Sequence, residues 1–156
     1  MLTATVLLTD IVDALEMLND EYPSFLDLDS GKVVTVSLEL LSEAEEGEED
    51  EEPDLPAWQD DEWEDAKRIA SSDRFRRLPT QFEVHEWEIM QEFAQSVKSE
   101  RIGEELLRAI HGSGAFRHFK NTLRREGVEA EWFAFRLGSL RQIATDWCEE
   151  NGVKWR

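Results

Sequence analysis

The chain has little that could cross-link it covalently or direct it to a membrane. Its 156 residues include one cysteine, Cys148, so no disulfide can form within the chain, which is typical of a reducing compartment. No lysine or arginine occurs in the first twenty residues, and the apolar run 4–8 is interrupted by Thr9 and Asp10. That run is too short for a signal peptide or a membrane span. We therefore expect a cytoplasmic protein without a membrane segment.

Basic side chains are scarce in the first part of the chain. Residues 1–60 contain eighteen acidic side chains and one basic one, Lys32, whereas residues 61–156 contain eighteen acidic and sixteen basic ones. Residues 43–65 carry fourteen acids and no base, and residues 106–125 carry five bases and no acid. The net charge of -19 is thus sorted by segment. Charge sorted in this way can determine which partners a surface attracts.

Metal-binding motifs are also missing. His85, Glu88 and Glu92 are spaced to share a helix face, but no CxxC or HExxH pattern accompanies them. A calcium loop beginning at Asp27 is excluded because Leu38 occupies the place of its closing glutamate. We expect no metal site and no cofactor.

The sequence offers no complete set of residues for nucleophilic catalysis. Ser113 lies near His111, but no acid is placed to orient the histidine. Cys148 stands next to Glu149 and Glu150, which favour the unreactive thiol over the thiolate. We predict no catalytic residue, and a non-enzymatic protein is favoured over an enzyme.

The front of the chain predicts one helix and a β-hairpin. Thr9 is a candidate N-cap for a helix that ends before Pro23. Residues 24–28 and 33–38 read as two strands around a polar turn. The acidic segment that follows favours a mobile linker because its charges repel one another. We expect a predominantly helical α+β protein, divided into a helix and hairpin region (1–42), an acidic flexible linker (43–57) and a helical region (58–156), all within one composite domain.

The helical region is predicted from caps and apolar spacing. Expected helices cover 62–71, then a run to Val97 that begins at a capping box formed by Thr80 and Glu83, with a connector over 74–79 between them. Further helices are capped by Ser99 and Ser113 and stopped by Gly127, and a break is expected near Gly138. Helical spacing places these aromatic side chains in the core: Trp87, Phe93, Phe116, Phe119, Trp132, Phe133, Phe135 and Trp147.

Several separated motifs resemble a widespread bacterial family that is catalogued only as uncharacterised. They are Phe25-Leu26-Asp27 with Gly31-Lys32-Val33-Val34, Leu78-Pro79 before Phe82 and Met90, Gly114-Ala115-Phe116-Arg117-x-Phe119-Lys120, and Trp147-x-Glu149-Glu150-Asn151-Gly152. The resemblance spans nearly the whole chain. It implies a small cytoplasmic protein with an N-terminal hairpin region and a helical C-terminal part, and it supplies no activity to carry over. The long acidic insert departs from the shorter connection expected in that family.

The leading functional hypothesis concerns the acidic segment. Its dense charge forms a strong local negative field that can engage a basic partner protein. The protein would then be a small interaction or regulatory protein. The candidate interaction residues are Glu45, Glu46, Glu48, Glu49, Asp50, Glu51 and Glu52.

The alternative hypothesis is binding of nucleic acid or a phosphate ligand through a basic helix. Arg117, Lys120 and Arg124 recur at helical spacing, opposite an apolar stripe, although the net charge of -19 disfavours nucleic acid. A Gly-Ser-Gly turn before that helix could hold an anion, so the full candidate set is Arg108, Ser113, Gly114, Arg117, Lys120 and Arg124. The acidic segment could also fold over this face and mask it. A phosphoryl- or nucleotide-handling enzyme that uses the turn is the third hypothesis.

Overall fold

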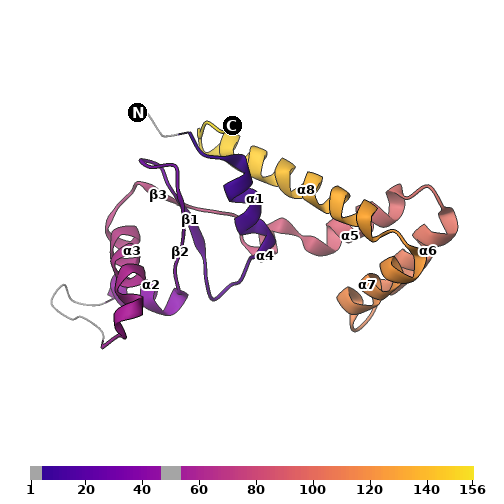
Figure 1. Cartoon of the computed structure of the whole chain (residues 1–156), viewed down its shortest axis with the longest axis horizontal. Helices are drawn as coiled ribbons and strands as arrows, with labels where there is room; N and C mark the ends of the chain where they lie inside the picture. Colours follow the sequence, from indigo (N-terminus) through magenta and orange to yellow (C-terminus); the bar gives the residue numbers. More distant parts are fainter. Residues whose placement is uncertain (1–4, 47–53) are drawn as a thin grey trace. The chain divides into compact units, whose positions relative to one another are not determined.

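The computed structural model describes residues 5–46 and 54–156. Helices dominate, and a three-stranded antiparallel sheet accompanies them, which confirms the predicted α+β class (Figure 1). No helix in these two ranges is long and apolar enough to cross a bilayer. The chain forms two compact units, Met1–Glu83 with Ala144–Arg156 (unit 1) and Val84–Ile143 (unit 2). These boundaries differ from the expected divisions at 42/43 and 57/58.

The sheet of unit 1 has its central strand at β1 (Ser24–Asp27). The hairpin partner β2 (Val33–Thr35) pairs Phe25 with Val34, so the predicted hairpin is confirmed with a shorter second strand. The third strand, β3 (Phe75–Arg77), pairs Phe25 with Arg77 on the other side of β1. Sequence analysis assigned β3 to a connector. That assignment was wrong because a three-residue strand depends on its partner's backbone rather than on its own apolar pattern.

A buried carboxylate, that of Asp27, holds the hairpin turn and β3 together. It accepts a hydrogen bond from the backbone N–H of Asp29 (3.0 Å) and another from Nη2 of Arg74 (3.2 Å). Gly31 has a φ of 75°, a conformation that glycine adopts without strain. Burial of the Asp27 carboxyl raises its pKa, but hydrogen bonds from Asp29 and Ser30 and the charge of Arg74 together hold this pKa below 3.8.

The first helix starts at a different residue from the one expected. α1 (Leu8–Glu16) includes Thr9, and Leu7 at the cap position provides no side-chain hydrogen bond. The start is held instead by the C-terminal tail of unit 1, because the N–H of Val6 donates to the carbonyl of Lys154 (2.9 Å) and the N–H of Arg156 donates to Val6 (3.1 Å). The apolar face of the helix is buried as its spacing predicted.

Part of the predicted acidic linker is helical. α2 (Leu38–Glu46) begins at a cap in which Ser37 Oγ accepts from the N–H of Leu40 (3.0 Å), and η1 (Ala57–Gln59) leads into α3 (Asp60–Ser71). The linker prediction was therefore wrong for residues 43–46. Acid content concealed an inner apolar face, because Leu40 packs with Trp63 and Ala66 of α3. Linker residues 47–53 lie outside the described part of the chain, and Ala57, the last residue of the expected linker, is the first residue of η1.

Unit 2 begins at Val84, the last residue of the short helix α4 (Gln81–Val84). α4 starts with the predicted capping box, since the N–H of Thr80 donates to Glu83 Oε1 (3.2 Å) and the N–H of Glu83 donates to Thr80 Oγ1 (3.3 Å). The helix does not run on to Val97, because His85 adopts a φ of 54° and α5 (Glu86–Ser96) begins after it. The other helices are α6 (Glu100–Ala109), α7 (Ala115–Glu126) and α8 (Glu129–Glu150), of which residues 129–143 belong to unit 2.

An aromatic cluster forms the centre of unit 2. The Trp132 ring centroid lies 4.9 Å from that of Phe119 and 5.4 Å from that of Phe93. Three expected core residues are instead exposed, Trp87 by 37%, Phe116 by 53% and Phe133 by 62%. Phe116 stands in the first turn of α7, where no described element covers it. Phe133 directly follows Trp132, so its side chain leaves the helix about 100° further round, and in α8 that direction faces away from the core.

Two glycines within helices have different surroundings. A Cβ on Gly103 would lie 2.6 Å from the carbonyl oxygen of Ala94, so close packing of α6 against α5 requires glycine there. A Cβ on Gly138 would meet nothing within 4 Å. The expected break at Gly138 is wrong, because α8 passes through it without interruption (Figure 1).

The buried Asp27 leads to a prediction about stability. Asp27→Asn should lower the free energy of unfolding at pH 7 by about 2 kcal/mol, because a charge-assisted hydrogen bond is lost. The folded-state pKa is lowered, so the contribution is present above 3.8 and disappears as the pH falls through the lowered value. Urea unfolding at pH 7 and at stepwise lower pH measures this difference.

Asp29→Asn is the matched control, since Asp29 also lies near Arg74 (3.7 Å) but its side chain is exposed. Its cost should stay below about 0.5 kcal/mol. Equal costs for the two variants would show that the buried carboxylate has no special role.

Candidate functional surfaces

The two units differ sharply in net charge. Unit 1 contains 27 acidic and eight basic side chains, and unit 2 contains nine of each. The whole net charge of -19 therefore belongs to unit 1. Unit 2 is neutral overall, and any basic surface on it results from the way its charges are distributed.

The turn between α6 and α7 consists of two glycines in left-handed conformations around a serine. Gly112 has a φ of 123° and Gly114 a φ of 75°. Gly114 rather than Ser113 occupies the N-cap position of α7, and no side chain caps this helix. The predicted Ser113 cap is thus wrong, and Ser113 lies exposed in the turn.

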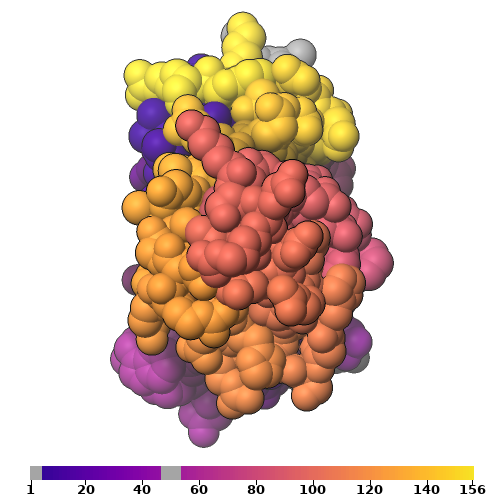
Figure 2. All heavy atoms as spheres, turned by 90° about the vertical axis from the view of Figure 1, so that its right-hand side faces the viewer, coloured from indigo at the N-terminus to yellow at the C-terminus, as the bar shows by residue number. Residues whose placement is uncertain are grey.

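The three basic residues Arg117, Lys120 and Arg124 are exposed on α7 opposite its buried residues Phe119 and Leu123. Nε of Arg124 lies 3.8 Å from Glu129. No carboxylate of the described residues lies within 4.0 Å of Arg117 or Lys120. We call these three side chains the basic face, and the α6–α7 region that carries it faces the viewer in Figure 2.

Other candidate residues lie at a separate place, a shallow depression of about 480 Å³ between α6 and α7. Arg108 and Ser113 line it, while Gly114 and the basic face do not. The sequence analysis did not include His111, His118 or Arg125 in the anion site, although the helical period places His118 and Arg125 on the same side of α7. Five of the six candidates therefore belong to two separate surfaces, and Gly114 belongs to neither. The complete lining is Glu105, Arg108, Ala109, His111, Gly112, Ser113, His118, Thr122 and Arg125.

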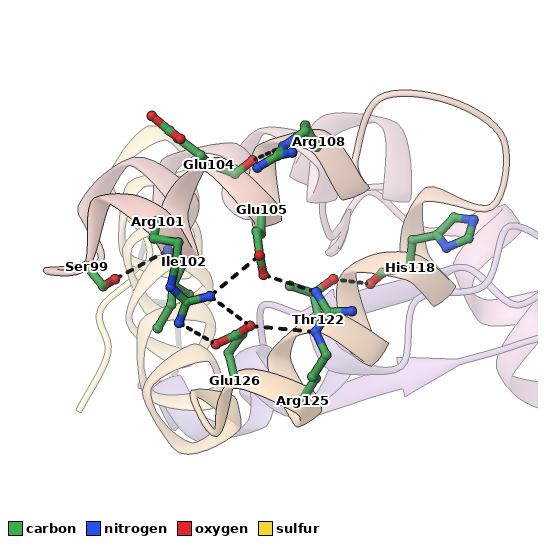
Figure 3. A network of polar contacts seen from close by, with 10 residues as sticks. All are labelled: Ser99, Arg101, Ile102, Glu104, Glu105, Arg108, His118, Thr122, Arg125 and Glu126. Carbon is green, nitrogen blue, oxygen red and sulfur yellow. Dashed lines mark hydrogen bonds and ion pairs between the residues drawn. The ribbon is translucent and has the colours of Figure 1, made fainter.

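A network of ion pairs joins α6 to α7 beside this depression (Figure 3). Nη2 of Arg101 lies 2.9 Å from Glu126, and Nη2 of Arg125 lies 3.1 Å from Glu105. Hydrogen bonds from Arg101, its positive charge and the nearby Arg125 lower the pKa of Glu126 from 4.5 to about 2. The network neutralises Arg125, so this arginine differs from the exposed cations of the basic face.

The acidic surface of unit 1 lies on α2 and its surroundings. Two depressions, of about 440 and 470 Å³, share Glu39; the first is also lined by Glu21 and the second by Glu43 and Asp54. We call these four carboxylates the acidic surface. Within the described ranges, no lysine or arginine nitrogen lies within 4.0 Å of them.

Exposed apolar side chains accompany the acidic surface. Tyr22 and Leu38 line the first depression and are each more than two-fifths exposed. Of the acidic residues named from the sequence, Glu45 and Glu46 are exposed at the end of α2. The others, residues 48–52, lie outside the described part of the chain. Glu43 and Asp54 belong to the acid-rich segment 43–65 recognised in the sequence, whereas Glu21 and Glu39 were missed because they lie outside it.

The described residues include no group of three or more His, Cys, Asp or Glu side chains that could hold a metal ion. His85 instead occupies the left-handed position between α4 and α5. Cys148 is fully buried, and burial raises the pKa of its thiol to about 11, so the nucleophilic thiolate is disfavoured.

One protein-family model matches nearly the whole chain. The model of the Uncharacterised protein family (UPF0158) matches residues 3–155. The chain belongs to this family. The resemblance expected from the hairpin and helical motifs is thereby confirmed at the level of the family. No match was found among curated proteins or among solved structures.

The ion-pair network predicts how the stability of this UPF0158 member depends on pH. Glu126 has a lowered folded-state pKa, so its stabilising contribution is complete above 4.5 and is lost as the pH falls toward 2. Glu126→Gln should therefore lower the free energy of unfolding at pH 6, and the difference from the parent should shrink toward zero near pH 2. Chemical unfolding across this range measures it.

Glu100→Gln, which removes an exposed carboxylate from the same unit, should leave the pH profile unchanged. Titration of the Glu126 carboxyl carbon by NMR gives an independent measurement. A midpoint near 4.5 would show that the network does not form in solution.

Proposed function

We propose that this protein is a non-enzymatic interaction protein whose acidic surface binds a basic segment of a partner protein. The observation that carries the proposal is the concentration of the entire net charge in unit 1, together with the four carboxylates of the acidic surface around adjoining depressions. Carboxylates without a cation nearby remain available to lysine and arginine side chains of another molecule.

Neighbouring apolar side chains support a peptide as the ligand. Tyr22 and Leu38 are exposed beside the carboxylates, and Trp58 of η1 is exposed by 77%. Aromatic and apolar contacts add affinity that is less sensitive to salt than charge alone. A basic segment that also carries apolar residues fits this surface better than a simple polycation.

The structure also decides which variants can test the proposal. Deletion of residues 43–65 would remove Trp63, which is buried against Leu40. Loss of binding in such a deletion would therefore report unfolding as readily as loss of charge. Glu-to-Gln substitutions keep the side-chain shape and remove only the charge.

A second candidate function is binding of a single-stranded nucleic acid to the basic face. The specific observation in its favour is the contrast between Arg125, which is paired with Glu105, and Arg117 and Lys120, which have no described carboxylate within 4.0 Å. Phosphate contacts of such cations release counterions. Unit 2 is neutral overall, so the charge of unit 1 is the main term that opposes this function.

The proposed acidic surface is tested with the double variant Glu39→Gln/Glu43→Gln. This double variant should bind a labelled lysine- and leucine-containing peptide about three- to tenfold more weakly than the parent, because two charge contacts are lost. Fluorescence anisotropy at low and physiological salt measures the affinity. The parent affinity should itself fall as salt is added.

The matched control is Glu100→Gln/Glu104→Gln, which removes the same charge at the same helical spacing from α6 of unit 2. It should bind the peptide nearly as the parent does. Equal weakening in both double variants would show that the peptide responds only to net charge, and the proposal would fail.

The basic face is tested with the triple variant Arg117→Ala/Lys120→Ala/Arg124→Ala. The slope of log affinity against log salt for a single-stranded oligonucleotide should become shallower by about two, since each phosphate contact contributes about 0.7. A variant with Ala at the exposed Lys32, Lys98 and Lys154 removes the same charge elsewhere and should keep the parent slope. Identical slopes for all three proteins would exclude the basic face.

A further inference from the structure

The two outer edges of the sheet in unit 1 differ in what they contact. At β3, the backbone groups of Phe75 and Arg77 point away from β1, since the N–H of Leu78 donates to β1. The carbonyl of Arg77 accepts a hydrogen bond from Nε1 of Trp147 (3.1 Å), which lies in the part of α8 that belongs to unit 1. The carbonyl of Phe75 accepts one from Nη1 of Arg76 (3.2 Å). Side chains of the same unit therefore occupy this edge.

The outer edge of β2 has no such contacts. The N–H of Val36 donates to the carbonyl of Pro23 (3.2 Å), and the carbonyl of Lys32 accepts from β1, so the even-numbered residues of this segment face β1. The backbone N–H and C=O groups of Val33 and Thr35 therefore point outward. No described residue forms a hydrogen bond with these four groups.

The outward row of backbone groups continues at Ser37. Its N–H donates to Oε1 of Glu62 on α3 (2.7 Å), so a carboxylate already reaches the row at this point. Ser37 also lines both depressions of the acidic surface, as does Glu39. The open edge of β2 is thus continuous with the acidic surface.

The residues of β2 do not protect its open edge. Exposed edge strands are usually kept from pairing by charged residues, by proline or by a covering element. β3 carries Arg76 and Arg77 and contacts Trp147, whereas β2 consists of Val33-Val34-Thr35, which favour extended backbone and carry no charge. An extended segment of another chain can bind such an edge through main-chain hydrogen bonds. Because β2 is short, pairing is limited to two outward residues, and other contacts have to add to the affinity.

Charge determines which segment fits this edge. Unit 1 contains 27 acidic and eight basic side chains, so the edge of a second copy would bring a like charge to the same place. A basic segment is attracted instead. Partner side chains beside Val34 would extend the apolar cluster of Phe25, Val36 and Leu41, against which Val34 packs. Because side chains alternate along a strand, a segment of alternating apolar and basic residues meets both requirements.

We propose that the basic partner segment binds as an additional strand on the outer edge of β2. Its backbone pairs with Val33 and Thr35, and its basic side chains reach the acidic surface beyond Ser37. This inference rests on the proposed function and specifies the conformation in which the partner is held.

Amide hydrogen exchange of the full chain, followed by NMR with and without a peptide of alternating lysine and leucine, tests the proposal. In the free protein, the amides of Val33 and Thr35 should exchange much faster than that of Val34, which pairs with Phe25. Saturation with the peptide should slow exchange at Val33 and Thr35 by at least about tenfold, while Val34 is protected in both states.

Thr35→Pro provides a second measurement. It removes an outward N–H that the sheet itself does not use, and proline is tolerated at such an edge position. Thr35→Val is the matched control, since both variants lose the hydroxyl that contacts Ser24 Oγ (2.7 Å) and only proline removes the N–H. Fluorescence anisotropy should show at least about tenfold weaker peptide binding for Thr35→Pro and less than about a twofold change for Thr35→Val. Circular dichroism checks that both variants fold.

The possible outcomes separate this inference from the proposed function. If the parent does not bind the peptide, both fail. Binding that leaves exchange at Val33 and Thr35 unchanged, or equal weakening by the two folded variants, would overturn the edge pairing alone. Protection of both amides in the free protein at high concentration would assign the edge to a second copy and would also overturn the proposal. Exchange is measured on the parent, so it decides the question even where Thr35→Pro unfolds.

Discussion

Electrostatic repulsion is the constraint under which unit 1 folds. With 27 acidic and eight basic side chains, it can neutralise only a minority of its carboxylates internally. Of the acids that the structure describes, Asp27 alone is buried, and Arg74 with the turn's N–H groups stabilises its charge. The other acids lie at least partly exposed, while Leu40 and Trp63 supply the apolar contact between α2 and α3. The fold thus tolerates its charge by keeping it hydrated, and hydrated charge remains accessible to a partner.

Unit 2 differs from unit 1 because its acidic and basic side chains are equal in number but unevenly distributed over its surface. The ion pairs of Arg101 and Arg125 with Glu126 and Glu105 use acids and bases on the adjoining sides of α6 and α7. Glu105 and Glu126 are engaged in these ion pairs, and the basic face lies on the opposite side of α7. Unit 2 is therefore neutral overall and yet has a positive surface on one side of α7, because the acids of these ion pairs lie on the other side of that helix. A charge count along the sequence detects the excess of bases but does not show which of them are paired.

Features that depend on near neighbours could be predicted from the sequence, and those that depend on distant partners could not. The capping box of Thr80 and Glu83 and the cap of Ser99 involve residues only three positions apart in the sequence, and both predictions are confirmed. β3 was missed because it exists only beside β1. α2 was missed because its charged composition outweighed the Leu40 and Leu41 pair in the sequence pattern. Helical spacing identified the basic face, whereas the acidic surface adds Glu21 and Asp54 to the two glutamates of α2, and no local pattern connects those residues.

α8 shows what the apolar periodicity of a helix cannot predict, namely which of its apolar residues the chain itself covers. A stripe of apolar residues predicts that something covers it, and sequence analysis placed both Trp132 and Phe133 in one core. The structure assigns the first to the chain's own core and leaves the second exposed. The two helix glycines differ in the same way. Packing against α5 requires glycine at position 103, whereas at Gly138 a Cβ would meet no atom of the chain within 4 Å.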